Sequence, residues 1–283
     1  MTTNLPVVRA TGIPRTVRRA AIRVPPTVVL AAVVLLGVLL WSLIPGAFTS
    51  YDPVTGDTAE KLLAPSAAHW FGTDYLGRDV FSRVVHGTAS SVTSALVAVL
   101  IGLVVGSIIG LASGFLSGWV DTVLGRVVDV LLAIPGFLLA VVIVSSLGFQ
   151  TINAAIATGV SAIAVFARLM RAETLRARGS VFVEASYLQG GNRVHALVRH
   201  VLPNAYRSVV ALAVLQFGTS ILVIASLAFL GYGDPPPASD WGLLVASGKG
   251  YATAPWLVYA PALVIVATVL SVNRISNWMR KAT

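Results

Sequence analysis

The sequence predicts an all-α polytopic membrane protein with six transmembrane helices, because its composition is apolar and its uncharged windows are long. Of the 283 residues, 56% are hydrophobic and 11% are charged, and the mean hydropathy is +0.85. The charged share is less than half that of an ordinary soluble domain. Five windows without Asp, Glu, Lys or Arg are long enough to cross a bilayer, at residues 24–51, 84–120, 130–167, 208–233 and 250–273. Their apolar residues are continuous rather than alternating, which favours helices over the strands of a barrel.

Six spans follow from these windows. The window 130–167 is too long for one helix, and the polar stretch 145–153 divides it into two. The span before this stretch is expected to begin near Asp121 and to bend at Pro135-Gly136, because proline removes a backbone hydrogen bond. The expected spans are 27–46, 88–113, 122–147, 151–170, 207–231 and 255–276.

The basic residues near the span ends predict the orientation. The N-terminal tail carries five Arg and no acid, and the loop 168–207 carries seven Arg against two Glu. By the positive-inside rule, this loop and both termini lie in the cytoplasm. The tail and first span could be mistaken for a signal peptide, but the long apolar run favours a retained anchor. The chain is thus divided into a basic cytoplasmic tail (1–26), a first span (27–46), an extracytoplasmic loop (47–87) and a helical core (88–283). The core includes a cytoplasmic loop at 171–206.

The extracytoplasmic loop ends in a cluster of charges, formed by Asp74, Arg78, Asp79 and Arg83. These side chains can neutralise one another within ten residues of chain. Two interpretations are open: a self-satisfied structural loop, or an exposed docking or gating surface for an external partner. Exposed ion pairs contribute little to stability, so on the second interpretation neutralising the charges spares folding and impairs docking.

The second span carries a stripe of glycines at every fourth position, at Gly102, Gly106, Gly110, Gly114 and Gly118. Small residues at this spacing allow the backbones of two helices to approach closely in lipid. The stripe therefore predicts tight packing against a neighbouring helix. It does not by itself indicate transport.

The third span begins with a possible charge pair on one helix face. Arg126 and Asp129 are three residues apart, a spacing at which opposite charges on a helix interact. An interfacial ion pair within this helix is the expected arrangement, and a functional contact is the alternative.

The cytoplasmic loop contains a short helix that no lipid surface explains. The helix is expected at about 181–189, with Ser180 as its N-cap and Gly190-Gly191 ending it. A second helix at 194–201 leads into Leu202-Pro203 and the next span. The first helix has no basic residue, which an interfacial lipid-bound helix would need. Its apolar side chains therefore predict contact with a soluble protein partner, at Phe182, Tyr187 and Leu188.

Several function classes are excluded by what the sequence lacks. It contains no P-loop, no Cys, no metal-spaced cluster of ligands and no paired carboxylates within a span, so no catalytic or metal site is expected. The net charge of +9 lies near span ends, where topology and anionic lipid account for it, so no nucleic-acid partner is expected. The spans also lack the intramembrane charges typical of ion coupling. A transporter of this kind needs an external source of energy. The alternative function classes are a self-contained channel or carrier and a membrane enzyme, and these would function without such a source.

The motifs of the chain resemble a known family. The segment Glu184-Ala185-Ser186-x3-Gly190, followed by Leu202-Pro203, is similar to the EAA loop of permease subunits of bacterial ATP-binding-cassette importers. Ser186 replaces the second alanine of that motif. Further motifs resemble the dipeptide/oligopeptide permease of the C type, in the expected order over about 70–280: Gly72-Thr73-Asp74, Gly77-Arg78-Asp79, Arg126-x2-Asp129-x5-Pro135, Arg199-His200-Val201-Leu202-Pro203-Asn204 and Phe229-Leu230-Gly231-Tyr232-Gly233.

The resemblance implies a type I (MetI-like) permease fold in the bacterial plasma membrane. It implies that this chain, itself not an enzyme, binds no cofactor, and that it pairs with a B-type permease, two cytoplasmic ATPase domains that bind ATP and Mg, and an extracytoplasmic substrate-binding protein. The coupling helix seated on the ATPase would then contain Glu184, Ala185, Ser186, Tyr187 and Gly190. The implied substrates are di- or oligopeptides, and the alternative is a non-peptide solute such as nickel, haem or a glycoside carried by the same machinery.

Overall fold

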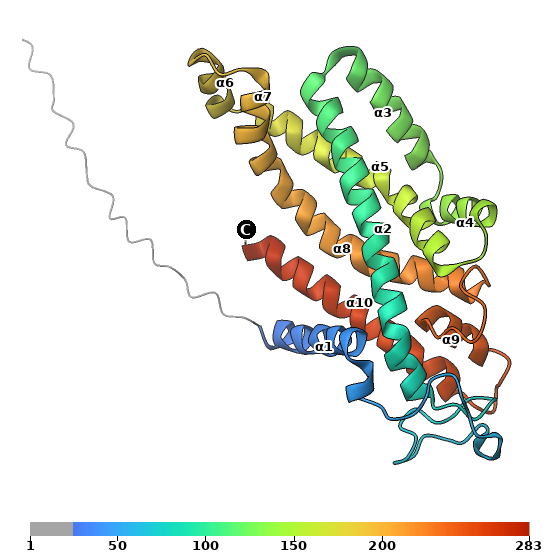
Figure 1. The fold of residues 1–283 in the computed structure, drawn as a ribbon. Coiled ribbons are helices and arrows are strands. Elements are labelled where there is room, and N and C mark those ends of the chain that lie inside the picture. Colours follow the sequence, from blue (N-terminus) through green and yellow to red (C-terminus); the bar gives the residue numbers. More distant parts are fainter. Residues whose placement is uncertain (1–24, 283) are drawn as a thin grey trace, which may run out of the picture.

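The computed structural model describes residues 25–282, and these residues form a bundle of helices without a β-strand (Figure 1). Residues 1–24, which make up most of the expected basic tail 1–26, lie outside the description. The α-helices are α1 (Pro26–Leu43), α2 (Val80–Leu116), α3 (Gly118–Ala133), α4 (Gly136–Leu147), α5 (Thr151–Arg178), α6 (Val181–Leu188), α7 (Arg193–Ala196), α8 (Leu202–Phe229), α9 (Trp241–Gly248) and α10 (Trp256–Ala282). Short 3₁₀ turns follow at Pro45–Ala47 and Thr58–Glu60, and a π-helix at Leu197–Val201 joins α7 to α8.

The predicted helical membrane fold is confirmed, with the third span broken. Helices α1, α2, α5 and α10 and the stretch Val194–Phe229 are each long and apolar enough to cross a membrane. The pair α3 and α4 makes a sixth span if it is counted as one, but its two halves are bent by 91°. The break falls at Ile134, whose backbone is extended because the ring of Pro135 disfavours a helical residue before it.

Several helices extend beyond the expected spans, and one short helix was not expected. Helix α2 begins at Val80 rather than near 88, because the Asp79 carboxylate accepts a hydrogen bond from the Ser82 amide at 2.6 Å and caps the helix. Helix α5 continues past 170 to Arg178. The loop 232–254 contains α9, which the sequence pattern missed. The carboxylate of Asp240 caps α9 by accepting from the amides of Gly242 and Leu243, each at 3.1 Å.

The pair formed by α2 and α5 is the centre of the bundle, and it has the most extensive contact of any two helices (Figure 1). Four glycines of α2 lie directly against α5. A Cβ placed on Gly106 would lie 2.5 Å from the carbonyl oxygen of Ile163, and one placed on Gly110 would overlap the backbone of Ala167. Gly102 faces the side chains of Ala162 and Phe166, and Gly114 faces Thr174 in the same way. Because these positions lack side chains, the two backbones touch.

The fifth glycine of the stripe does not take part in this contact, so the packing role expected for Gly118 is wrong. Its backbone has a φ of +62°, and a Cβ placed on it would meet nothing within 4 Å. Helix α2 ends at Leu116, and Gly118 begins α3 after the turn at Ser117. The four-residue spacing of glycines therefore extends in the sequence past the end of α2. Only the glycines within α2 lie on the helix face that packs against α5.

The remaining helices surround the central pair. Helix α8 packs against α5, α2 and α10, and α1 lies along α10. Helices α6 and α7 lie at one end of the bundle, called the α6 end below. The connection 44–79 and α9 lie at the opposite end, called the α9 end (Figure 1). There Trp241 is fully buried and donates through its indole nitrogen to the Val84 carbonyl at 3.2 Å, so it belongs to the core rather than to an interfacial aromatic belt.

We predict that Gly110→Ala lowers the stability of the purified protein. The added methyl group overlaps the backbone of α5, and overpacking of this kind costs about 1–3 kcal/mol. Thermal unfolding in detergent measures the change. Gly37→Ala in α1 is the matched control, since a Cβ there meets nothing within 4 Å. Equal melting temperatures for the two variants would contradict the close approach of α2 and α5.

Candidate functional site

Helix α6 is held by main-chain bonds at both ends. The carbonyl of Ser180 accepts from the amides of Val183 and Glu184 at 3.0 and 3.2 Å, which starts the helix. The Ser180 hydroxyl instead donates to the Ala177 carbonyl, so the side-chain cap expected there is replaced by a bond back to α5. At the other end Gly190 has a φ of +85°, and the Gly191 amide donates to the Ser186 carbonyl at 2.9 Å. This bond closes a Schellman motif, in which glycine suits the left-handed position.

One residue anchors α6 to the bundle. Val183 is fully buried, in a cluster with Ala177 of α5, Ala196 of α7 and Val201 of the π-helix. Leu111 and Phe115 of α2 pack against this cluster. Through Val183 the helix therefore packs with α5, α7, the π-helix and the glycine-bearing α2.

The opposite face of α6 is open. Val181 and Leu188 are 81% and 85% exposed, and Phe182 is 45% exposed. Glu184 and Ala185 are exposed, and Ser186 is half-buried. Tyr187 lies in α6, but its side chain is outside what the structure describes. Large apolar side chains exposed on so short a helix indicate a surface that a protein partner covers.

The expected second helix of this loop is partly a π-helix. Asn192 caps α7 by accepting from the His195 amide at 2.7 Å. After one turn the chain continues as the π-helix Leu197–Val201, and Leu202 and Pro203 begin α8. Proline is tolerated in this first turn because its missing amide would have no helical partner there.

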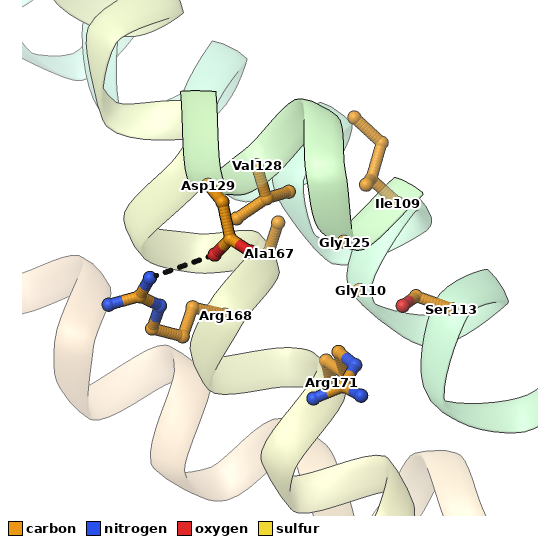
Figure 2. A pocket seen from close by; sticks show the side chains of 9 residues that line it. All are labelled: Ile109, Gly110, Ser113, Gly125, Val128, Asp129, Ala167, Arg168 and Arg171. Atoms are coloured by element: carbon orange, nitrogen blue, oxygen red, sulfur yellow. Dashed lines mark hydrogen bonds and ion pairs between the residues drawn. The ribbon is translucent and has the colours of Figure 1, made fainter. Parts of the chain in front are cut away.

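Charged side chains clamp α3 to α5 at the same end of the bundle. Arg171 binds Asp121 through two bonds, from its Nε and Nη2 atoms, of 2.6 and 2.7 Å. Asp129 pairs with Arg168 of α5 at 3.3 Å, so the expected pair with Arg126 within α3 is wrong. Figure 2 shows this pair beside a pocket of about 150 Å³ between α2, α3 and α5. Because α5 lies against this face of α3, its arginine reaches Asp129 and replaces the local partner.

The charge cluster at the α9 end is buried, so of the two interpretations the self-satisfied structural loop is supported and the exposed docking surface is wrong. Four residues of the cluster are each only 3% to 5% exposed: Asp74, Arg78, Asp79 and Arg83. The Asp74 carboxylate accepts from the Arg78 Nε at 2.7 Å and lies 3.6 Å from the Arg83 Nη1 atom. It also accepts from the amides of Leu76 and Arg78, so the local chain wraps around it.

The same cluster joins three parts of the chain. Asp79 caps α2 and also contacts the Nδ1 atom of His69 at 2.9 Å. His69 is buried, and its Nε2 atom lies 3.4 Å from Glu60 in the connection 44–79. Arg83 donates to the Ala238 carbonyl at 3.0 Å, which ties α2 to the segment before α9. The role of His69 was missed because a lone histidine in a loop carries no spacing signal.

Asp240 adds a third buried carboxylate at this end, beside Asp74 and Asp79. Burial raises the pKa of the Asp240 carboxyl, and the negative charge of Asp234 raises it further, while the bonds from the α9 amides oppose the shift. The carboxyl thus caps α9, although burial removes water from it and disfavours its charged form. Together these contacts make the α9 end a rigid cover on α2.

The family of the chain is shown by its match to a family model. The model of the binding-protein-dependent transport system inner membrane component matches residues 102–283. The chain belongs to this family. It is therefore a multi-pass membrane subunit of a transport system, and not itself an enzyme.

Curated relatives agree with this assignment. The chain is 34% identical over 255 residues to the dipeptide transport system permease protein DppC of Alkalihalophilus pseudofirmus, covering 90% of this chain and 84% of the relative. It is 42% identical over 219 residues to the glutathione transport system permease protein GsiD of Shigella flexneri, covering 77% and 72%. It is 36% identical over 256 residues to the probable D,D-dipeptide transport system permease protein DdpC of Escherichia coli, covering 90% and 86%.

Solved structures support the fold. The permease fold matches a chain of the inward-facing MetNI methionine ABC transporter with a TM-score of 0.59 at 17% identity, covering 71% of this chain and 96% of that one. An amino acid ABC transporter crystallised with histidines matches with a TM-score of 0.56 at 16% identity, covering 71% and 94%. The expected type I (MetI-like) architecture is thereby confirmed.

We predict that Asp74→Asn destabilises the protein strongly. The substitution leaves Arg78 and Arg83 buried without their counter-charge, and breaking a buried pair in this way costs about 3–5 kcal/mol. Thermal unfolding of the purified variant measures the loss. Arg168→Gln is the control, because both partners of its ion pair are 63% exposed and such pairs contribute little. Equal stability of the two variants would restore the interpretation of the cluster as a docking surface.

Proposed function

We propose that this chain forms, with a second permease of the B type, the pathway by which an ATP-driven importer carries di- or oligopeptides across the bacterial plasma membrane. The peptide assignment is supported by the relatives, whose names specify dipeptides, D,D-dipeptides and glutathione, itself a tripeptide. On this proposal an extracytoplasmic binding protein delivers the substrate. Two cytoplasmic ATPase domains bind ATP and Mg, and this chain binds no cofactor. A non-peptide solute carried by the same machinery is the alternative.

The observation that carries the coupling role is the contrast between the two faces of α6. The open face, with Phe182, Glu184, Ala185 and Leu188, offers a contact for a groove on an ATPase domain. The buried face holds the helix through Val183. A displacement of the ATPase domain would move α6 as a unit, because the Schellman motif at Gly190 closes its end.

The movement of α6 would pass to the spans through packing. Val183 contacts the end of α5 and the π-helix that leads into α8. Helix α5 in turn lies directly against α2 along the four glycines, and backbone atoms of α5 approach Gly106, Gly110 and Gly114. Packed interfaces of this kind move as bodies rather than deform, so a push on α6 would tilt α5, α8 and α2 relative to the second permease.

We predict that Gly190→Trp uncouples ATP hydrolysis from uptake. A side chain is strained at a φ of +85°, and the Trp ring would project from the end of the contact surface. The assay uses proteoliposomes with this chain, the B-type permease, the ATPases and the binding protein, and it records both uptake of a labelled dipeptide and ATP hydrolysis. Uptake should fall while hydrolysis continues without substrate stimulation.

The control for this experiment is Gly118→Ala. Gly118 also has a positive φ and open space around it, but it lies outside the coupling loop. Its variant should retain uptake. Normal stimulated uptake in Gly190→Trp would remove α6 from the coupling path. Absence of dipeptide uptake in the unsubstituted complex, with uptake of another solute, would favour the non-peptide alternative.

We predict that the α6 end faces the cytoplasm and the α9 end faces outward. The natural sequence has no cysteine, so single substitutions report topology directly. In cells that express this chain without the ATPase subunits, an impermeant thiol reagent should label Thr55→Cys directly and should reach Leu188→Cys only after permeabilisation, since both positions are exposed in the isolated chain. The charge asymmetry of the loops is the physical reason. The reverse labelling pattern would overturn the topology.

A further inference from the structure

A large groove with charges of both signs lies beside the coupling helix. It has a volume of about 790 Å³ and is bounded by α5, the start of α6 and the first half of α8. Its apolar lining comes from Leu169, Leu212 and Leu215, and its charged groups are Glu173, Arg176 and Arg207. This volume lies within the range of about 300–1,000 Å³ typical of small-molecule sites.

The charges of the groove are unequally satisfied. Glu173 has a side chain that is only 12% exposed, and it pairs with Arg176, which is 75% exposed, at 2.8 Å. Arg207 is exposed on α8 and makes no ion pair with any residue that the structure describes. The groove therefore presents one carboxylate, already partly neutralised, and a guanidinium without a counter-charge.

We propose that this groove binds a zwitterionic di- or tripeptide from the side of the coupling helix. Arg207 would hold the terminal carboxylate through paired guanidinium bonds, Glu173 would hold the terminal ammonium, and the leucines would contact an apolar side chain. The proposal rests on the proposed import of peptides, whose product is released on this side. The groove offers the Glu173 carboxylate to a terminal ammonium, a group that the headgroup of phosphatidylglycerol lacks.

An occupant of the groove would also touch the coupling helix. Ser180 and Phe182, at the start of α6, line the groove together with Ala177 of α5 and Ser208 of α8. A bound peptide would thus bridge the two spans and the helix that must move between them. Accumulated product would hold α6 in one position and slow further uptake.

Protection of a single cysteine tests the binding site. The chain has no cysteine of its own, and Ser208→Cys places one in the groove with little change of size. The assembled complex in nanodiscs, with partner chains lacking reactive cysteines and without binding protein, is labelled with a small charged thiol reagent. The dipeptide Ala-Leu at about ten times its dissociation constant should slow labelling about tenfold, since only unoccupied protein reacts.

Three controls make the result specific. N-acetyl-Ala-Leu-amide, which carries neither terminal charge, should not protect Ser208→Cys. Adding Arg207→Gln should abolish protection, whereas Arg126→Gln, an exposed arginine of α3 away from the groove, should leave it intact. Ser117→Cys, in the turn between α2 and α3 and outside the lining of the groove, should be labelled equally fast with and without Ala-Leu.

Several outcomes would overturn the inference. Failure to label Ser208→Cys in the complex would mean that the partner permease covers the groove. Protection by the blocked peptide, or by phosphatidylglycerol in place of Ala-Leu, would exclude recognition of a zwitterion. ATP-driven uptake of Ala-Leu by proteoliposomes, combined with no protection, would refute this site and leave the proposed function standing. Protection without such uptake would refute the proposed peptide import and leave the site.

Discussion

The contact between α2 and α5 is the constraint on which the rest of the structure depends. In a bilayer, apolar side chains gain nothing by leaving lipid for another apolar helix, so association rests on close van der Waals packing. Gly102, Gly106, Gly110 and Gly114 provide it by bringing the backbone of α2 onto α5. One end of this pair carries the capped start of α2, and the other leads into α6. The coupling surface and the cover at the α9 end are therefore attached to the same rigid unit.

Burial decides what the charged residues do at the two ends of this unit. At the α9 end, Asp74 and the two arginines beside it are removed from water, and each depends on the others for its counter-charge. Such a cluster specifies one arrangement of the loop at the cost of desolvation. At the α6 end, the pair of Arg168 and Asp129 is exposed and contributes little, whereas the two-bond contact of Arg171 with Asp121 positions α3. The same residue types are thus structural where they are buried or doubly bonded, and contribute little where they are exposed.

The coupling surface illustrates a division between packing and recognition. Val183 holds α6 to the bundle, whereas Val181 and Leu188 are 81% and 85% exposed. A helix of eight residues has little stability of its own, so its end bonds and its single anchor maintain its shape. This arrangement suits a part that a second protein must grip and move. The groove proposed to bind a peptide is bounded by the same helix.

Composition and local pattern were sufficient for the fold class, for most spans and for the position of α6. Hydropathy is additive along the chain, and helix ends depend on adjacent residues, so the uncharged windows and the Gly190-Gly191 stop could be interpreted without coordinates. The tertiary structure alone decided which charges are buried, that Asp129 pairs with Arg168, that Gly118 leaves the stripe and that Trp241 caps the core from α9. These outcomes depend on which helices lie side by side, and contacts between residues far apart in the sequence leave no mark on local spacing.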